Sequence, residues 1–187
     1  MKRYSLYISS LIFIFSVAIS GQQRVPLPRA SQKATVTQTV GVTDIKITYS
    51  RPAVKGRKIF GEWTTDIKGE ATLDNQNTRP KDAVIVPFGH VWRTGANEAT
   101  LFEINDDVLI NGQSLKAGKY SLHTIPGKDE WTIIFNTDDG QWGSFSYDAK
   151  KDALRVKAKP SMAHMSAELV TYDFTNVTAD SAQVNIS

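Results

Sequence analysis

The chain has 187 residues and no cysteine, which excludes disulfide bonds, thiolate nucleophiles and thiolate metal ligands. It carries 22 Lys and Arg against 19 Asp and Glu. The basic residues are scattered singly or in pairs, whereas a nucleic-acid-binding surface needs them clustered, so we expect no nucleic-acid partner. One domain is the natural count for this length, which is sufficient to bury a core without disulfide bonds.

The N-terminal residues have the pattern of a secretory signal peptide. Lys2 and Arg3 precede an apolar stretch, residues 6–19, which ends in small side chains at Ser20. We predict a signal peptide over residues 1–20 and hence a periplasmic or extracellular protein. The apolar stretch is short for a transmembrane span and no basic cluster follows it, so we expect no permanent membrane anchor. Without the leader, 20 basic residues face 19 acidic ones, and the excess of positive charge nearly disappears.

Residues 21–33 are polar and contain prolines, which predicts an extended lead-in. From residue 34 to residue 187 we expect a single β domain, because apolar side chains alternate with polar ones at the period of half-buried strands. Residues 34–40 and 44–49 are β-branched runs separated by a short connection that contains Gly41. This arrangement predicts a β-hairpin.

Further alternating runs follow at regular spacing, at residues 99–104, 108–110, 119–125, 131–136, 154–158, 170–174 and 182–186. Residues 105–107 (Asn-Asp-Asp) are expected to turn the first of these runs back on the second, and Asn111-Gly112 is a strong hairpin signal. No segment has the 3.6-residue apolar repeat of a helix. About ten short strands therefore predict an all-β, antiparallel β-sandwich of the jelly-roll or immunoglobulin-like type, with a barrel as the alternative.

Residues 63–82 break this rhythm, because they are polar and contain few apolar side chains. We predict a long polar loop insertion in the β domain. Loops of this length in compact domains are usually functional or disordered, so a surface flap and a disordered segment are both open.

Three blocks of sequence resemble a known family. They are Y-S-R-P at 49–52 with K-G-R-K-I-F-G at 55–61, P-F-G-H-V-W-R-T-G-A-N-E-A-T at 87–100, and A-G-K-Y-S-L at 117–122 running on to I-P-G-K-D-E-W at 125–131. Together they resemble DUF2911, a family of exported proteins of unknown function found mainly in Bacteroidetes-type bacteria. The resemblance spans roughly residues 28–186. It implies export, a β-rich fold and no established activity.

The sequence differs from the usual pattern of this family in the middle and near its end. Members usually join the first two blocks by a short connection, so the insertion at 63–82 is a difference. Members also often run into another strand near the end, and this chain stops at Ser187 directly after an alternating run. Two expectations are therefore equally open: the chain ends on this strand, or the sequence continues beyond Ser187.

The densest group of polar and aromatic residues is the segment 92–98, which follows His90. It contains Trp92, Arg93, Asn97 and Glu98 within seven residues. An aromatic face can stack on the apolar face of a sugar, while guanidinium, amide and carboxylate groups bind hydroxyl groups. The alternative is a structural corner in which Trp92 is part of the core and Arg93 pairs with Glu98 to join two strands.

A second group of cations, Arg51, Arg57 and Lys58, lies in a stretch with proline and glycine. These side chains are suited to hold an anionic group of a ligand. The alternative is a solvated edge at which basic side chains prevent strand addition.

The sequence predicts no metal site. His90, His123 and His164 are 33 and 41 residues apart, which fits no compact ligand motif. His123 alternates with Ser121 and Ile125, so we expect a histidine with its hydrogen bonds satisfied in the core or at the surface.

No catalytic residue and no cofactor follow from the sequence either. Linear sequence supplies no carboxylate pair of the glycosidase kind. There is no G-x-S-x-G elbow, no calcium loop and no phosphate-binding glycine loop.

Three hypotheses follow. The first is an exported, non-enzymatic β-sandwich that binds a glycan or small polar ligand through seven residues: His90, Trp92, Arg93, Asn97, Glu98, Arg51 and Arg57. The second is a hydrolase of envelope glycans with Glu98 as the acid/base. The third is a structural envelope protein without a ligand site. An exposed groove at residues 92–98 favours binding, whereas a second carboxylate about 5–10 Å from Glu98 favours hydrolysis. The oligomeric state does not follow from the sequence.

Overall fold

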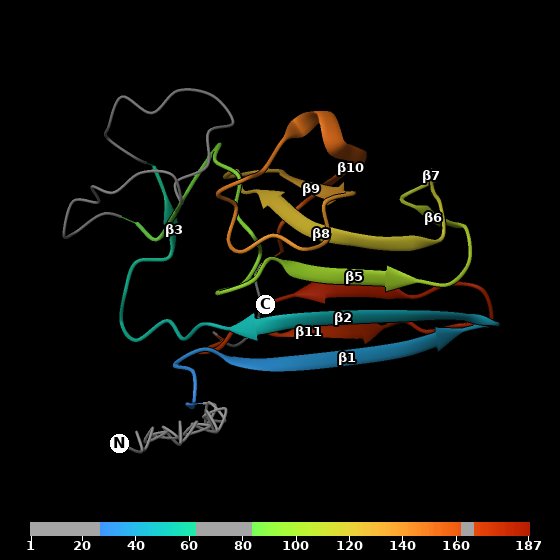
Figure 1. Ribbon diagram of the computed structural model, residues 1–187, viewed down its shortest axis with the longest axis horizontal. Coiled ribbons are helices and arrows are strands. Elements are labelled where there is room, and N and C mark those ends of the chain that lie inside the picture. The colour runs from blue at the N-terminus through green and yellow to red at the C-terminus, as the bar shows by residue number, and fades with distance from the viewer. Residues whose placement is uncertain (1–26, 63–83, 162–166) are drawn as a thin grey trace, which may run out of the picture.

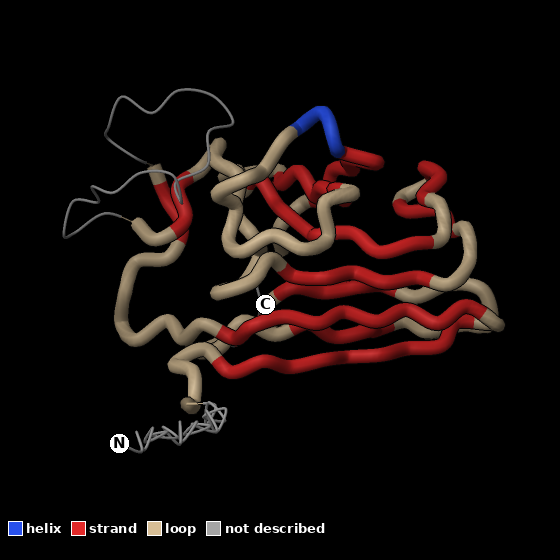
Figure 2. Tube along the Cα trace, in the orientation of Figure 1, coloured by secondary structure: helices blue, strands red, loops and turns tan. Residues whose placement is uncertain are grey.

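Figures 1 and 2 show the computed structural model of the chain, which describes residues 27–62, 84–161 and 167–187. The predicted signal peptide, the insertion at 63–82 and His164 lie outside the described residues. Within these ranges nearly all regular structure is strand, and one short 3-10 helix, η2, spans Ala149–Lys151. Among the same residues no helix has the length and apolar character that a membrane span needs.

A six-stranded sheet forms the body of the domain, with the strand order β1-β2-β5-β8-β9-β10 (Figure 1). Each strand is antiparallel to its neighbours. The strands are β1 (Gln32–Val40), β2 (Thr43–Arg51), β5 (Thr100–Ile104), β8 (Gly118–Ile125), β9 (Trp131–Asn136) and β10 (Asp152–Ala158). β1 and β10 are therefore the two edges of this sheet.

Two tight turns confirm the hairpins that their residues predicted. Gly41 has φ +61° between β1 and β2, the conformation that a type II′ turn requires at its first central residue. Asn111 and Gly112 both have positive φ, as in a type I′ turn, and connect β6 (Val108–Ile110) to β7 (Gln113–Leu115).

A second, smaller layer covers one face of the sheet. The hairpin of β11 (Tyr172–Thr175) and β12 (Gln183–Ile186) lies across this face, and Figure 1 shows it behind β2. The hairpin β6–β7 contributes to the same core and contacts β10. The sheets formed by the described strands do not close, so the predicted sandwich is confirmed over the barrel. The buried core between the layers consists of Ile47, Tyr49, Phe102, Ile104, Leu115, Tyr120, Leu122, Phe135, Val156 and Tyr172.

Aromatic contacts join the two layers. The rings of Tyr49 in β2 and Tyr172 in β11 are 4.6 Å apart, and within the six-stranded sheet the rings of Phe102 and Phe135 are 5.0 Å apart. The hydroxyl of Tyr172 donates a hydrogen bond to the carbonyl of Thr94, at 2.9 Å. Since Thr94 belongs to the segment 92–98, the smaller layer fixes the position of that segment.

The opposite face of the sheet is polar. Cross-strand partners place Thr48, Ser121, Asn136 and Asp152 in one row, with Leu101 between the first two. Ser121 and Asn136 are nevertheless fully buried, because the chain after β9 folds back over this end of the face. This covered polar face carries the candidate site.

Several predicted details are wrong or incomplete. β5 does not turn back on β6, because β5 pairs with β2 and β8 in the middle of the sheet. β7 and the parallel pair β3 (Phe60–Gly61) and β4 (Val86–Pro87) are additional strands. β1 begins at Gln32, so the last two residues of the predicted lead-in belong to the sheet.

The two leucines of the β6–β7 hairpin test the assignment of the core. Leu115 is 2% exposed in the core, whereas Leu109 is 70% exposed. Leu115→Ala should therefore lower the free energy of unfolding by about 2–5 kcal/mol, and Leu109→Ala by no more than ~0.5 kcal/mol. Urea denaturation of the two variants measures this difference. Equal losses of stability would contradict the placement of the core.

Candidate functional site

The segment 92–98 is an excursion of the chain just before β5 begins. Trp92 forms a bridge with Thr124 in β8, and the chain rejoins the sheet at Thr100. In between, Thr94 and Asn97 adopt positive φ, at 56° and 60°. Gly95 lies so close to β2 that an added Cβ would come within 3.1 Å of the carbonyl oxygen of Ser50. The absence of a side chain at position 95 therefore lets the segment pack against the sheet.

Trp92 is half-buried in a cluster of three aromatic rings. Its ring centroid is 5.8 Å from that of Phe60 and 6.5 Å from that of Trp131. The indole N–H donates to the carbonyl of Gly95, at 3.2 Å. These contacts hold Trp92 in a small satellite cluster, which leaves its ring only partly exposed and less open than the stacking platform that the sequence suggested.

Glu98 pairs with Arg29, not with Arg93. Nη1 of Arg29 lies 2.6 and 2.7 Å from the two carboxylate oxygens, and Nζ of Lys33 lies 4.0 Å from Oε1. Burial acts to raise the pKa of Glu98, but the Arg29 hydrogen bond, a backbone hydrogen bond and the two positive charges together outweigh it. The pKa lies below its ordinary value of 4.5, and the carboxylate is ionised at neutral pH.

The remaining predicted residues have mainly structural contacts. Asn97 donates to the carbonyl of Ser31, at 3.1 Å, and His90 is buried. Arg51 donates to the carbonyl of Val170 and to the hydroxyl of Thr171, so it ties β2 to the chain before β11. The guanidinium of Arg57 donates to two carbonyl groups of its own turn, those of Ala53 and Val54.

A loop that the sequence did not single out, residues 137–148, completes the site. Its backbone is bonded to the segment 92–98: Ala99 N–H donates to the Gln141 carbonyl, at 3.0 Å, and Gly143 N–H donates to the Asn97 carbonyl, at 2.9 Å. Between these two bonds, Glu98 and Trp142 form a bridge. The two segments therefore behave as one unit.

This loop presents two exposed aromatic rings, and one of them, Trp142, lies next to Glu98. Trp142 is 55% exposed and Phe145 is 48% exposed. The guanidinium carbon of Arg29 lies 5.7 Å from the centroid of the Trp142 ring, within the range of a cation–π contact. We call Arg29, Glu98, Trp142 and Phe145 the Trp142 surface. Three aromatic residues within six positions of a loop with glycine and serine, at 142, 145 and 147, are the signal that could have indicated it.

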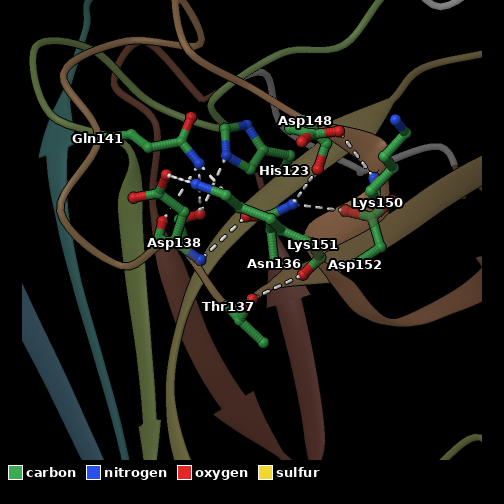
Figure 3. Close-up of polar contacts among 10 residues, drawn as sticks. His123, Asn136, Thr137, Asp138, Gln141, Asp148, Lys150, Lys151 and Asp152 are labelled. Atoms are coloured by element: carbon green, nitrogen blue, oxygen red, sulfur yellow. Dashed lines mark hydrogen bonds and ion pairs between the residues drawn. The ribbon is translucent and has the colours of Figure 1, made fainter.

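Beneath the loop, buried side chains of the sheet form a hydrogen-bond network (Figure 3). The amide of Gln141 reaches Ser121 Oγ, Asn136 Oδ1 and the Asp138 carbonyl at 3.2–3.5 Å. Ser121 Oγ and His123 Nε2 are 3.1 Å apart. Ser121 and His123 have no solvent exposure, so in this arrangement the pair attaches the loop to the sheet and no substrate can reach it.

Asp152, at the start of β10, is the second centre of this network. Its carboxylate accepts hydrogen bonds from Asn136 Nδ2 at 2.7 Å, Tyr147 Oη at 2.8 Å and Arg155 Nε at 2.7 Å. Burial, and next the hydrogen bond to Asp152, raise the pKa of Tyr147, so its phenol stays neutral and donates. The end of the loop is therefore attached to β9 and β10 through one nearly buried carboxylate.

The described residues hold no group of three or more histidine, aspartate or glutamate side chains placed to bind a metal ion. The ionised carboxylate, the cations and the two exposed rings of the Trp142 surface instead fit the recognition of a polar ligand with an apolar face.

The fold and this site define an all-β sandwich whose loops gather at one end of a polar sheet face. A family model described as "Protein of unknown function (DUF2911)" matches residues 31–187. The chain therefore belongs to the DUF2911 family. Neither a curated protein nor a solved structure matches it.

Gly143 tests whether the loop and the segment 92–98 fit together as described. Its φ is +69°, and an added Cβ would lie 2.7 Å from Arg93 Nη1 and 2.8 Å from the Phe145 ring. Gly143→Ala should displace the loop and lower the free energy of unfolding by roughly 1–3 kcal/mol. Gly140→Ala is the matched control, since nothing lies within 4 Å of a Cβ at that position. Equal stability of the two variants in thermal denaturation would contradict this packing.

The ion pair at Glu98 predicts a dependence of stability on pH. Because the folded pKa is lowered, the pair stabilises the fold above about pH 4.5, and this contribution is lost as the pH falls through the folded pKa. Glu98→Gln should lower stability at pH 7 by ~0.2–1 kcal/mol, the range for exposed pairs, and the difference should vanish in acid. Carboxyl NMR titration should also show the Glu98 pKa rising in Arg29→Gln. An unchanged pKa in that variant would contradict the pairing.

Proposed function

We propose that this protein is an exported, non-enzymatic binding module that holds a glycan on the Trp142 surface. The observation that carries this proposal is the exposure of Trp142 and Phe145, three positions apart in a loop whose backbone is bonded to a neighbouring segment. Single exposed apolar side chains need no explanation, but large rings presented by an anchored loop are typical of a binding surface.

The chemistry of the surface supports a carbohydrate ligand. The flat faces of indole and phenyl rings match the apolar faces of sugar rings. Glu98 and Arg29 lie beside Trp142, Lys33 lies near Glu98, and the three supply charged hydrogen-bond acceptors and donors for hydroxyl groups. Because the loop is held by hydrogen bonds before any ligand arrives, binding does not have to order it, which lowers the entropic cost of association.

The state of Glu98 favours binding over hydrolysis. A glycosidase that uses this residue as its general acid needs a neutral carboxyl group with a raised pKa. Here Arg29 and Lys33 keep the pKa of Glu98 below its ordinary range. An ionised carboxylate that is already paired with a guanidinium is suited to accept hydrogen bonds from hydroxyl groups.

The N-terminal sequence supports a location where glycans are accessible. A positive n-region and an apolar stretch precede the domain, and family resemblance implies export. The near balance of charge after the leader and the scattered basic residues give no support to a nucleic-acid partner.

A glycan-array screen of the purified protein tests this proposal. Once a bound glycan is found, Trp142→Ala should weaken its affinity at least tenfold, or about 1.4 kcal/mol, because the stacking face is lost. Leu109→Ala is the matched control, since it removes an exposed apolar side chain from the β6–β7 hairpin. Trp92→Ala should reduce stability more than affinity.

Each alternative has its own result in the same experiment. Retained affinity in Trp142→Ala would contradict the proposed surface. Release of reducing ends from the bound glycan, lost in Glu98→Gln, would favour the hydrolase. Absence of binding to any glycan would favour a structural role for the domain.

A further inference from the structure

The two edges of the six-stranded sheet differ in how they are protected. On β10, the pairing register to β9 shifts between Asp152 and Leu154, and Arg155 and Lys157 add charge. The side chain of Asn111 also donates a hydrogen bond to the carbonyl of Lys157, at 2.9 Å. Irregular register, charges and an occupied carbonyl are the features by which natural sheets prevent strand addition.

β1 has almost none of these features. It is nine residues long, and its register to β2 runs unbroken from Gln32 to Val40. It contains no proline, and Lys33 is its only charged residue. A long, regular edge strand with little charge is a template for another strand.

The β1–β2 turn determines which backbone groups of β1 are available. In a two-residue hairpin the closing pair, here Val40 and Thr43, is hydrogen-bonded, and bonded and non-bonded pairs then alternate. The residues Lys33, Thr35, Thr37 and Thr39 therefore direct their N–H and C=O groups away from β2. The Thr39 carbonyl accepts from the Gln38 side chain, at 2.8 Å. Three consecutive outward residues remain, with Thr35 at their centre.

We propose that β1 is an interface through which two copies of this chain pair by antiparallel strand addition, with Thr35 opposite Thr35 of the second copy. This register places Lys33 opposite Thr37 of the second copy, so the two lysines do not face each other. The central pair is two β-branched threonines, a favourable cross-strand combination. The segment is thus complementary to itself about a two-fold axis, as a symmetric dimer requires.

In the paired copies, the polar faces of the two sheets lie on one side and the core faces on the other. Cross-strand partners project to the same side, so the exposed threonines of both copies lie on the polar face. The partly buried Ala34 and Val36 lie on the opposite, core face in both copies. Because only three hydrogen-bonded residue pairs form, the contact is short, and we expect association that depends on protein concentration.

Sedimentation equilibrium of the purified protein tests the pairing. The average mass should rise toward twice the chain mass as the concentration increases. Thr37→Pro removes an outward N–H without breaking a bond to β2, so it should fold and stay monomeric. Thr37→Val, which retains the N–H, should associate like the wild type. A constant monomer mass, or equal association of the proline variant, would overturn the proposal.

Cross-linking provides a second test that does not depend on the folding of the proline variant. The chain has no cysteine, so a single introduced thiol can form an intermolecular disulfide only with its own copy. Thr35→Cys should form dimers under mild oxidation much faster than Lys159→Cys, an exposed position just beyond the opposite edge strand. Equal rates for the two variants would overturn the proposed register and interface.

Discussion

Hydrogen bonds between two loops hold the candidate site together. The segment 92–98 and the loop 137–148 exchange backbone bonds on both sides of the Glu98–Trp142 bridge, through Gln141 and Asn97. Without these bonds, Trp142 and Phe145 would lie on an independent loop, and their positions relative to Glu98 would not be fixed. Trp142 and the charged groups form one surface because the backbone places Glu98 and Trp142 side by side, and Phe145 follows three residues later in the same loop.

The position of the loop depends in turn on the polar face of the sheet. Ser121 and Asn136 have no exposure, and buried polar groups are costly unless they are hydrogen-bonded. The amide of Gln141 and the Asp148 carbonyl supply such bonds. Asp152 needs partners for the same reason, since removing one member of a buried charge pair costs ~3–5 kcal/mol. The sheet and the loop therefore satisfy each other's hydrogen-bonding groups. As a consequence, the loop that carries Trp142 and Phe145 is held in place.

Local features of the fold were predictable and nonlocal ones were not. The turns at Gly41 and Asn111-Gly112 follow from residues that tolerate positive φ, and the strands around them follow from alternation. The place of β5 between β2 and β8 depends on pairing between distant strands, which alternation does not encode. β3 and β4 have two residues each, too few to show a period.

The candidate site, too, depends on contacts between distant residues that the sequence does not reveal. Glu98 was a candidate because of its neighbours in sequence, but its partner, Arg29, comes from the lead-in 69 residues away. Trp92 and Trp142 cannot be ranked as platforms from sequence, because exposure depends on what packs against each ring. Trp92 contacts Phe60 and Trp131, whereas Trp142 is more than half exposed.

The indole N–H signals of the four tryptophans provide the most direct test of the ligand-binding account. Each signal can be assigned by single substitution and followed by NMR while a glycan is added. We predict that the Trp142 signal shifts progressively with glycan concentration, while those of Trp92 and Trp131 remain in place. A shift of the Trp92 or Trp131 signal with Trp142 unchanged would contradict the account.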